Sequence, residues 1–280
     1  MGGDGVAFRE ASLAIDFHSP AVAGTYASRS ADTGWLDAIS ALAPVRGSRV
    51  ADIGCGGGIY STALAAAGAA SVVGVDFSAQ MVRDARQRAA SQHLASVRFR
   101  QGQATNTGLP TGEMDLVLWR ALIHHLPDIP AALIETHRIL RAEGVLLIQD
   151  RTAADVFAPP SPTHIRGWFF TCFPHLADVE RNRRLRAERL LADLTETGFE
   201  LRDQHRLAEV RRTYHDVSEL RADLLARTGR SLLHELTDQE LSELADYICG
   251  QVAAARRPGE KLVEVDYWTI WSATARPHTA

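Results

Sequence analysis

A short apolar segment that runs directly into a cluster of glycines constrains the fold of this chain more than any other feature. The segment is Val50-Ala51-Asp52-Ile53, and it is followed by Gly54-Cys55-Gly56-Gly57-Gly58 and then by helix-forming residues. A strand, a glycine-rich turn and a helix in this order gather free backbone N–H groups at the positive end of a helix dipole, which favours an anionic ligand group. The sequence therefore predicts an α/β fold with a nucleotide-type binding turn.

Strand-like and helix-like segments alternate after this turn, which is typical of a parallel sheet covered by helices on both faces. We expect strands over 49–53, 71–75, 97–100, 115–119 and 145–149, and helices over 60–67, 78–92 and 129–141, with Ser78 as an N-cap. Later we expect a helix over 183–197, a strand over 199–206, two helices within 217–255 and a last strand over 261–273.

The alternation is interrupted after Asp150. The stretch Ala158-Pro159-Pro160-Ser161-Pro162 cannot continue a helix or a central strand. Long irregular stretches inside a compact domain are usually lids or binding loops. The aromatic residues that follow make disorder the least favoured interpretation, and they are Trp168, Phe169, Phe170 and Phe173.

The composition excludes several classes of protein. The chain has 280 residues, of which 46% are hydrophobic and 23% charged, unlike disordered, collagen-like or coiled-coil chains. The formal net charge is −4, which gives no general attraction to nucleic acid or to an anionic membrane. Cys55, Cys172 and Cys249 lack C-x-x-C spacing, and we find no export signal and no membrane-spanning run. We expect a cytoplasmic protein that binds neither nucleic acid nor membrane.

Asp76 is the second residue that indicates a ligand. It ends the expected second strand, 18 residues after Gly58. A carboxylate at this place in a nucleotide-binding fold can accept hydrogen bonds from both ribose hydroxyls. The alternative is that Asp76 only caps the helix that begins near Ser78. Nicotinamide-dependent oxidoreductases share the glycine loop and the acid, so they form an alternative class.

Four motifs together resemble the class I S-adenosylmethionine-dependent methyltransferases, especially the bacterial small-molecule branch related to quinone-biosynthesis methyltransferases. The motifs are Val50 to Gly58, Val73 to Phe77, Gln101-Gly102-Gln103-Ala104, and Met114 to Leu126 with the sequence MDLVLWRALIHHL. The resemblance implies a Rossmann-like seven-stranded, mostly parallel sheet of order 3-2-1-4-5-7-6, sandwiched by helices. It also implies the cofactor S-adenosyl-L-methionine and the product S-adenosyl-L-homocysteine.

The resemblance also implies cofactor contacts. Gly54, Gly56 and Gly58 would shape the methionine end of the site, Asp76 would hold the ribose, and Phe77 would flank the adenine. Gln103 and Ala104 would lie at the adenine edge, where many relatives carry Asp in place of Gln103. The remaining cofactor-binding residues implied are Tyr26, Arg29, Asp52, Met81 and Arg120. For Tyr26 and Arg29 the alternative is an ordinary amphipathic cap on the sheet.

Methyl transfer from a sulfonium depends chiefly on alignment and exclusion of water. A general base matters when the acceptor must lose a proton. The candidate catalytic residues are His124 and His125, which follow Arg120, and the alternative is that they pack or start a helix. A metal site from His124, His125, Asp128 and His164 would lack regular ligand spacing, so we expect no metal.

Cationic side chains near the expected mouth of the site suggest the acceptor. Arg151, His164 and Arg166, together with Arg120, would fall on loops there and suit a carboxylate or a phosphate. Phe170 would line an apolar part of the pocket. The alternatives are that the arginines pair with lid acids such as Asp155 and that the aromatic residues only anchor the lid.

We expect one methyltransferase domain over residues 1–280. It would comprise a cap over 1–45, a cofactor-binding half over 46–150, a lid over 151–185 and a C-terminal half over 186–280 with a helical insertion over 215–258. A lidded site favours a small-molecule methyl acceptor. The alternatives are a methyltransferase of RNA or protein, an oxidoreductase, or a non-catalytic cofactor-binding subunit. Leu220, Leu224, Leu232 and Leu233 form an apolar stripe that fits either a lid or a surface for an oligomer.

Overall fold

The structure is a computed structural model, and it describes residues 31, 33–184, 186–257 and 260–277. Tyr26 and Arg29 lie outside the described residues. The elements are α1 (Thr33–Leu42), β1 (Arg49–Ile53), α2 (Ile59–Ala66), β2 (Ser71–Asp76), α3 (Ala79–Ser91), β3 (Val97–Gln101), β4 (Met114–Arg120), η2 (Ile123–His125), α4 (Ile129–Ile139), β5 (Leu140–Asp150), α5 (Ala153–Val156), α6 (Arg166–Cys172), α7 (His175–Arg183), α8 (Ala187–Glu196), β6 (Phe199–Tyr214), α9 (Val217–Leu225), η3 (Ser231–Glu235), α10 (Asp238–Ala255) and β7 (Leu262–Ala275).

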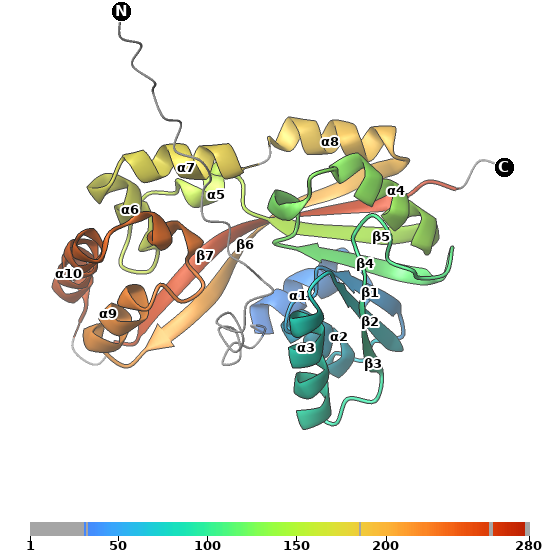
Figure 1. Cartoon of the computed structure of the whole chain (residues 1–280), viewed down its shortest axis with the longest axis horizontal. Coiled ribbons are helices and arrows are strands. Elements are labelled where there is room, and N and C mark those ends of the chain that lie inside the picture. Colours follow the sequence, from blue (N-terminus) through green and yellow to red (C-terminus); the bar gives the residue numbers. More distant parts are fainter. Residues whose placement is uncertain (1–30, 32, 185, 258–259, 278–280) are drawn as a thin grey trace, which may run out of the picture.

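The seven strands form one sheet of order β3-β2-β1-β4-β5-β7-β6, which confirms the predicted order. Strands β1 to β5 are parallel, and β7 runs antiparallel to both β5 and β6. Helices cover both faces of the sheet (Figure 1). Because a sheet covered in this way is buried on both sides, its central strands are apolar throughout rather than alternating. Four of the five residues of β1 are buried.

Two apolar clusters hold these layers together. Trp35 and Ile39 of α1 and Leu64 of α2 pack with Val50 and Leu118 on one face of the sheet. On the other face, Leu133 of α4 and Leu190 of α8 pack with strand residues such as Trp119. At about 1.5 to 3 kcal/mol for each fully buried large side chain, this burial is the main favourable contribution to folding.

Strands β6 and β7 are longer than predicted and leave the sheet together to support a second, helical lobe (Figure 1). Strand β6 was expected over 199–206, but it has 16 residues and ends at Tyr214. The extension was hard to predict because most of its side chains are charged or exposed. Within the described residues, no helix is long and apolar enough to cross a membrane.

The expected lid and the expected helical insertion form one lobe rather than two separate additions. Its core combines Trp168 and Phe169 of α6 with the leucine stripe of α9 and η3. Leu220, Leu224, Leu232 and Leu233 are at most 2% exposed, so the stripe is the interior of this lobe and not a surface for a second copy. The segment expected to be irregular is largely helical, with α5, α6 and α7 within it.

The predicted helix ends are partly correct. Ser78 accepts a hydrogen bond from the N–H of Met81 as the N-cap of α3, and Thr237 forms a capping box with Glu240 at the start of α10. The single helix expected over 183–197 is wrong at its beginning, because Arg183 ends α7 and α8 begins at Ala187.

Candidate active site

The glycine loop between β1 and α2 adopts a conformation that favours glycine. Gly54, Gly56 and Gly58 have φ angles of 74°, 51° and 77°, in the left-handed region where a Cβ atom is disfavoured. The loop is fixed to the next strand, because the N–H groups of Gly54 and Cys55 donate to the carbonyl of Val75 at 2.8 and 3.1 Å. The sequence therefore folds into a tight turn at the carboxyl end of β1.

The glycines of this turn serve two purposes. A Cβ on Gly54 would lie 2.8 Å from Leu122, and one on Gly58 would lie 2.8 Å from Phe99, so these two positions allow close packing. A Cβ on Gly56 or Gly57 would meet no atom within 4 Å. The backbone of Gly56 and Gly57 therefore faces open space, where a ligand can approach it.

Asp76 lies at the tip of β2, beside this open backbone. Its carboxylate accepts hydrogen bonds from the N–H of Gly56 at 2.8 Å and of Ser78 at 2.9 Å. The neighbouring Phe77 is 47% exposed. A carboxylate can accept about four hydrogen bonds, so holding the loop is compatible with a further donor such as a ribose hydroxyl.

The other predicted cofactor residues differ in their exposure. Gln103 is exposed on the loop after β3 and pairs through its backbone with Asn106, while Ala104 beside it is half-buried. Met81 is buried in α3. Asp52 is 2% exposed and accepts a 2.5 Å hydrogen bond from Ser61. This burial places the carboxyl of Asp52 under the loop rather than in the open space above it. Burial also raises the pKa of Asp52 to about 6.

Arg120 ends β4 and is held by a ring of polar and aromatic side chains. Its Nη2 donates to both carboxylate oxygens of Glu209 at 2.9 and 2.8 Å. Its guanidinium carbon lies 3.9 Å from the ring centre of Tyr60 and 4.5 Å from that of Trp268. Because Tyr60 is the second residue of α2, Arg120 lies next to the helix that follows the glycine loop.

A second group of cationic side chains surrounds Asp266 of β7. Arg151 donates to Asp266 at 2.6 Å, and Arg166 lies 3.7 Å from the same carboxylate. His164 contacts the carbonyl of Val265 at 3.3 Å. The structure thus brings Arg151, His164 and Arg166 together around one segment of β7. Arg120 and Arg166 do not lie on loops, however, because Arg120 ends β4 and Arg166 begins α6.

The alternative partner named for these arginines, Asp155, binds other residues. Asp155 accepts hydrogen bonds from Arg206 at 2.9 Å and from Thr269 at 2.7 Å, and it also caps α5. The acids that do face Arg120 and Arg151 are Glu209 and Asp266. Phe170 stacks on Phe157 with ring centres 4.7 Å apart, whereas Trp168 and Phe169 anchor α6 in the lobe.

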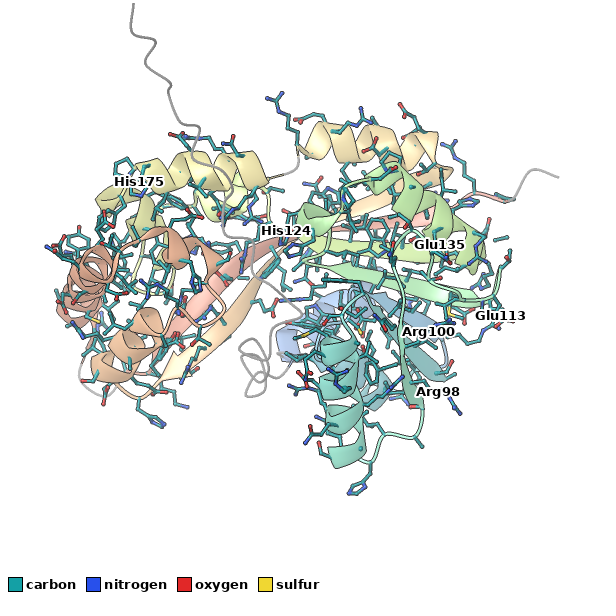
Figure 2. All side chains as sticks on the ribbon, in the orientation of Figure 1. Arg98, Arg100, Glu113, His124, Glu135 and His175 are labelled. Atoms are coloured by element: carbon teal, nitrogen blue, oxygen red, sulfur yellow. The ribbon has the colours of Figure 1, made fainter. Side chains whose placement is uncertain are left out.

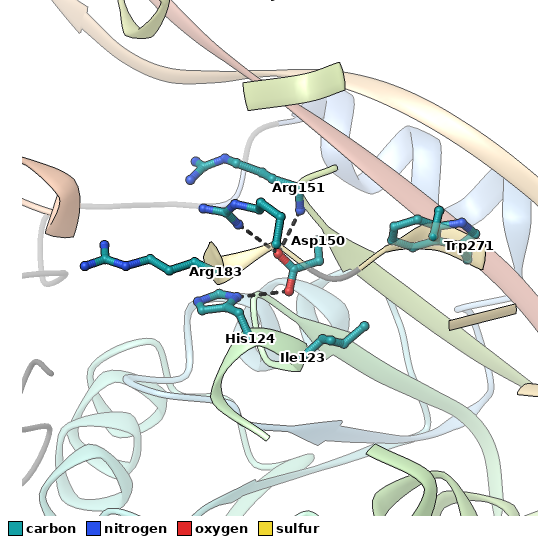
Figure 3. Close-up of a pocket in the computed structure, with 8 residues that line it drawn as sticks. Ile123, His124, Asp150, Arg151, Arg183 and Trp271 are labelled. Carbon is teal, nitrogen blue, oxygen red and sulfur yellow. Dashed lines mark hydrogen bonds and ion pairs between the residues drawn. The ribbon is translucent and has the colours of Figure 1, made fainter. Parts of the chain in front are cut away.

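Of the two histidines after β4, His124 contacts a carboxylate. Its Nδ1 lies 3.1 Å from Oδ2 of Asp150, the last residue of β5 (Figure 3). The ring of His125 stacks on His124 with centres 4.0 Å apart. Burial, together with His124, lowers the pKa of His125 to about 4. In Figure 2, His124 lies where the sheet and the helical lobe meet.

A small cavity of about 10 Å³ lies beside this pair, lined by residues that include His124, Asp150, Arg151 and Arg184. This volume holds about one water molecule. Among the described residues, no group of three or more His, Cys, Asp or Glu side chains is arranged to hold a metal ion.

Sequence reasoning missed Glu209, Asp266 and Trp268, which the antiparallel strands β6 and β7 contribute. All three side chains are nearly buried. The sequence pattern gave no signal for the two acids of β7, because Glu264 and Asp266 alternate with apolar residues and yet occupy the buried positions, while the apolar neighbours are half-buried. Burying a carboxylate requires a partner, so an inward-facing acid indicates a cation supplied from elsewhere in the chain.

These features fit a nucleoside-containing cofactor. The open backbone at Gly56 and Gly57 leaves room for a ligand at the N-terminus of α2, and Asp76 offers a carboxylate at the tip of β2. All of these groups lie at the carboxyl edge of the parallel strands, where open α/β sheets bind their ligands.

Comparisons with known proteins agree with this arrangement. A family model described as a methyltransferase domain matches residues 51–148. The ubiquinone biosynthesis O-methyltransferase of Neisseria meningitidis serogroup C is 36% identical over 113 residues, which is 40% of this chain and 47% of that protein. The chain therefore spans about half the length of this curated relative.

Two solved structures are similar in fold. The YcgJ protein of Bacillus subtilis aligns with a TM-score of 0.53 at 18% identity, over 86% of this chain and 97% of that one. A phosphoethanolamine N-methyltransferase of Haemonchus contortus aligns with a TM-score of 0.54 at 18% identity, over 87% of this chain and 52% of that one. At such low identity these likenesses concern the fold alone.

The sheet order and the loop at its carboxyl edge define a Rossmann-like α/β protein of the methyltransferase type. Within this fold, residues 51–148 match a methyltransferase domain.

Proposed function

We propose that this protein transfers the methyl group of S-adenosylmethionine to a small metabolite that bears a carboxylate or a phosphate. The cofactor would lie on the open backbone of Gly56 and Gly57, in the turn that Gly54 and Gly58 shape. Its ribose would lie on Asp76 and its adenine beside Phe77 and Gln103. Arg120, adjacent to α2, would face the methionine end. The cofactor supplies an electrophilic methyl group carried on a sulfonium.

The burial of Arg166 without a hydrogen-bond acceptor on any described residue is the observation that supports an anionic acceptor. Its side chain is only 9% exposed. Among the described residues its guanidinium makes no hydrogen bond, and the carboxylate of Asp266 at 3.7 Å is too distant to accept one. A buried guanidinium without acceptors is costly, since each unmet donor loses its hydration. A bound carboxylate or phosphate would provide the missing acceptors.

Two neighbours of Arg166 each make one hydrogen bond but have a second buried nitrogen that makes none to the residues described. Nε2 of His164 and Nε of Arg151 are buried and make no hydrogen bond within the part of the chain that the structure describes. Burial lowers the pKa of His164, and it lowers the pKa of Arg151 to about 10. At neutral pH this group therefore comprises two guanidinium cations and a neutral imidazole, all with donor capacity.

The cluster also lies close to the candidate catalytic histidine. Arg151 directly follows Asp150, the residue that contacts His124, and both line the same small cavity (Figure 3). An acceptor anchored at Arg151 and Arg166 would thus be held beside His124. The buried sites and the small size of the cluster favour a metabolite over a polymer.

Calorimetric titration tests this proposal in two steps. We expect binding of S-adenosylmethionine and S-adenosylhomocysteine but not of NADH. With S-adenosylhomocysteine bound, titration of inorganic phosphate and of benzoate as probe anions should show binding that Arg166→Met weakens about 10- to 100-fold. The control Arg189→Met changes a 63% exposed side chain on α8 and should bind as the wild type does.

Each result has a clear meaning. Binding of NADH in place of S-adenosylmethionine would make the protein an oxidoreductase. Cofactor binding without any effect of Arg166→Met on the probe anions would remove the anionic acceptor from the proposal and leave Arg166 a structural residue.

A further inference from the structure

The side chain of Asp150 is bound on several sides at the carboxyl end of β5. Its Oδ2 lies 3.1 Å from Nδ1 of His124, and its Oδ1 accepts the backbone N–H of Arg151 at 2.7 Å. Nη1 of Arg184 lies 3.5 Å from the same Oδ1. Every one of these groups is a donor or can act as one, so the surroundings favour the ionised carboxylate.

The charge of Asp150 follows from these contacts. Burial by itself would raise the pKa of this carboxyl, but the hydrogen bond with His124 and the charge of Arg184 hold it below its usual value. Arg184 is fixed in turn, because it also binds Glu180 of α7. The imidazole ring of His124 therefore lies at the end of a series of contacts that runs from Glu180 through Arg184 to Asp150.

An ionised carboxylate can only accept hydrogen bonds. Nδ1 of His124 must therefore carry the hydrogen, and in the neutral ring Nε2 then holds the lone pair. Nε2 makes no hydrogen bond with any described residue, and the His124 side chain is 24% exposed. The nitrogen that can take up a proton is thus the one that Asp150 leaves free, on a side chain that is partly exposed.

We propose that Asp150 is the positioning residue of a general-base pair with His124, and that the protein methylates a hydroxyl oxygen. This inference rests on the proposed function and extends it to the atom that is methylated. A hydroxyl must lose its proton as it is methylated, so a fixed base contributes about 10²- to 10⁴-fold, whereas an amine has a lone pair of its own.

The transfer balances in atoms and charge. The acceptor oxygen forms the new C–O bond while the C–S bond of the sulfonium breaks, and its electron pair remains on sulfur as a thioether. The hydroxyl proton passes to Nε2 of His124. The resulting imidazolium is stabilised by the charge of Asp150 and afterwards releases its proton to water.

The first test reads the ring directly and needs no acceptor. NMR of the histidine ring nitrogens should show His124 as the tautomer protonated on Nδ1 at neutral pH. Asp150→Asn should shift His124 toward the other tautomer, because an amide can donate to Nδ1. A wild-type His124 protonated on Nε2, or on both nitrogens at neutral pH, would overturn the proposal.

The second test compares methylation of 4-hydroxybenzoate and 4-aminobenzoate as probes, with products identified by mass spectrometry. We expect the hydroxyl probe to be the better substrate. Asp150→Asn should lower kcat about 10²-fold or more with little change in KM. The matched control is Asp115→Asn, because Asp115 is also held by arginines but near the opposite end of β4. It should retain kcat.

The two proposals can fail separately. Loss of cofactor or anion binding in the wild type would refute the proposed function. Normal binding together with methylation of the amine alone, or with an unchanged kcat in Asp150→Asn, would refute only the role of Asp150 and His124. If neither probe reacts, the tautomer of His124 decides.

Discussion

The backbone N–H of Gly56 donates a 2.8 Å hydrogen bond to the carboxylate of Asp76. This bond joins the turn after β1 to the tip of β2, so one side chain holds the glycine loop and the end of the neighbouring strand in a single arrangement. Ser78 donates to the other oxygen and connects the same carboxylate to the start of α3.

Asp76→Asn should weaken binding of S-adenosylhomocysteine. An amide has one acceptor oxygen in place of two, and it carries no charge, so hydrogen bonds worth about 1.5 to 3 kcal/mol are lost. We expect a rise in Kd of about 10- to 100-fold by calorimetry. The control is Asp84→Asn, because Asp84 lies in the following helix α3 and accepts a hydrogen bond from Gln80. Equal losses of affinity in both variants would contradict the role of Asp76.

Gly58→Ala should destabilise the fold, and Gly57→Ala should not. Gly58 has a φ of 77°, and a Cβ there would lie 2.8 Å from Phe99 and 2.9 Å from Ala85. Strain of this kind costs on the order of 1 to 3 kcal/mol. A Cβ at Gly57 meets nothing within 4 Å. Urea denaturation of the two variants measures the difference, and similar midpoints would show that the packing around Gly58 adjusts freely.

The stability should depend on pH through Asp52. Burial raises its pKa from 3.8 to about 6, so the folded state binds the proton more tightly than the unfolded state. The stability that protonation contributes is complete below the unfolded pKa and is lost as the pH rises through the folded one.

A shift of about two pKa units in Asp52 corresponds to a change of about 3 kcal/mol in the free energy of unfolding. In Asp52→Asn this loss is absent, so the free energy of unfolding of the variant, relative to the wild type, should increase by about 3 kcal/mol between about pH 4 and pH 8. Urea denaturation at both pH values measures it. A constant difference would show that Asp52 does not titrate in this range.

Arg230→Met should destabilise the helical lobe strongly. Arg230 is 2% exposed and binds Asp223 at 2.6 Å and Glu264 at 2.7 Å. Arg211 is then the remaining buried cation beside these two acids, and loss of one partner from a buried ion pair costs about 3 to 5 kcal/mol. The matched change Arg221→Met breaks an exposed pair with Asp246 and should leave the unfolding midpoint nearly unchanged, because solvent screens such pairs. Unfolding in guanidinium chloride measures the loss of stability in the two variants, and equal losses would contradict this account.

Local sequence patterns determined the first half of the fold and the cofactor loop. The continuous apolar strands, the N-cap at Ser78 and the glycines with positive φ express short-range preferences of the backbone, and such preferences can be read without knowledge of distant contacts. This is why β1, β2 and the turn at Gly54 to Gly58 lie where the sequence predicted them.

Only the tertiary structure decided the partners of the buried charges. Glu209 and Asp266 lie far along the chain from Arg120 and Arg151. They meet because β6 and β7 extend beyond the carboxyl end of β5, where Asp150 pairs with Thr269. The contact between His124 and Asp150 likewise arises because β4 and β5 are neighbours in the sheet. Pairing of this kind depends on the three-dimensional path of the chain and on the need to neutralise buried charge, neither of which a local pattern specifies.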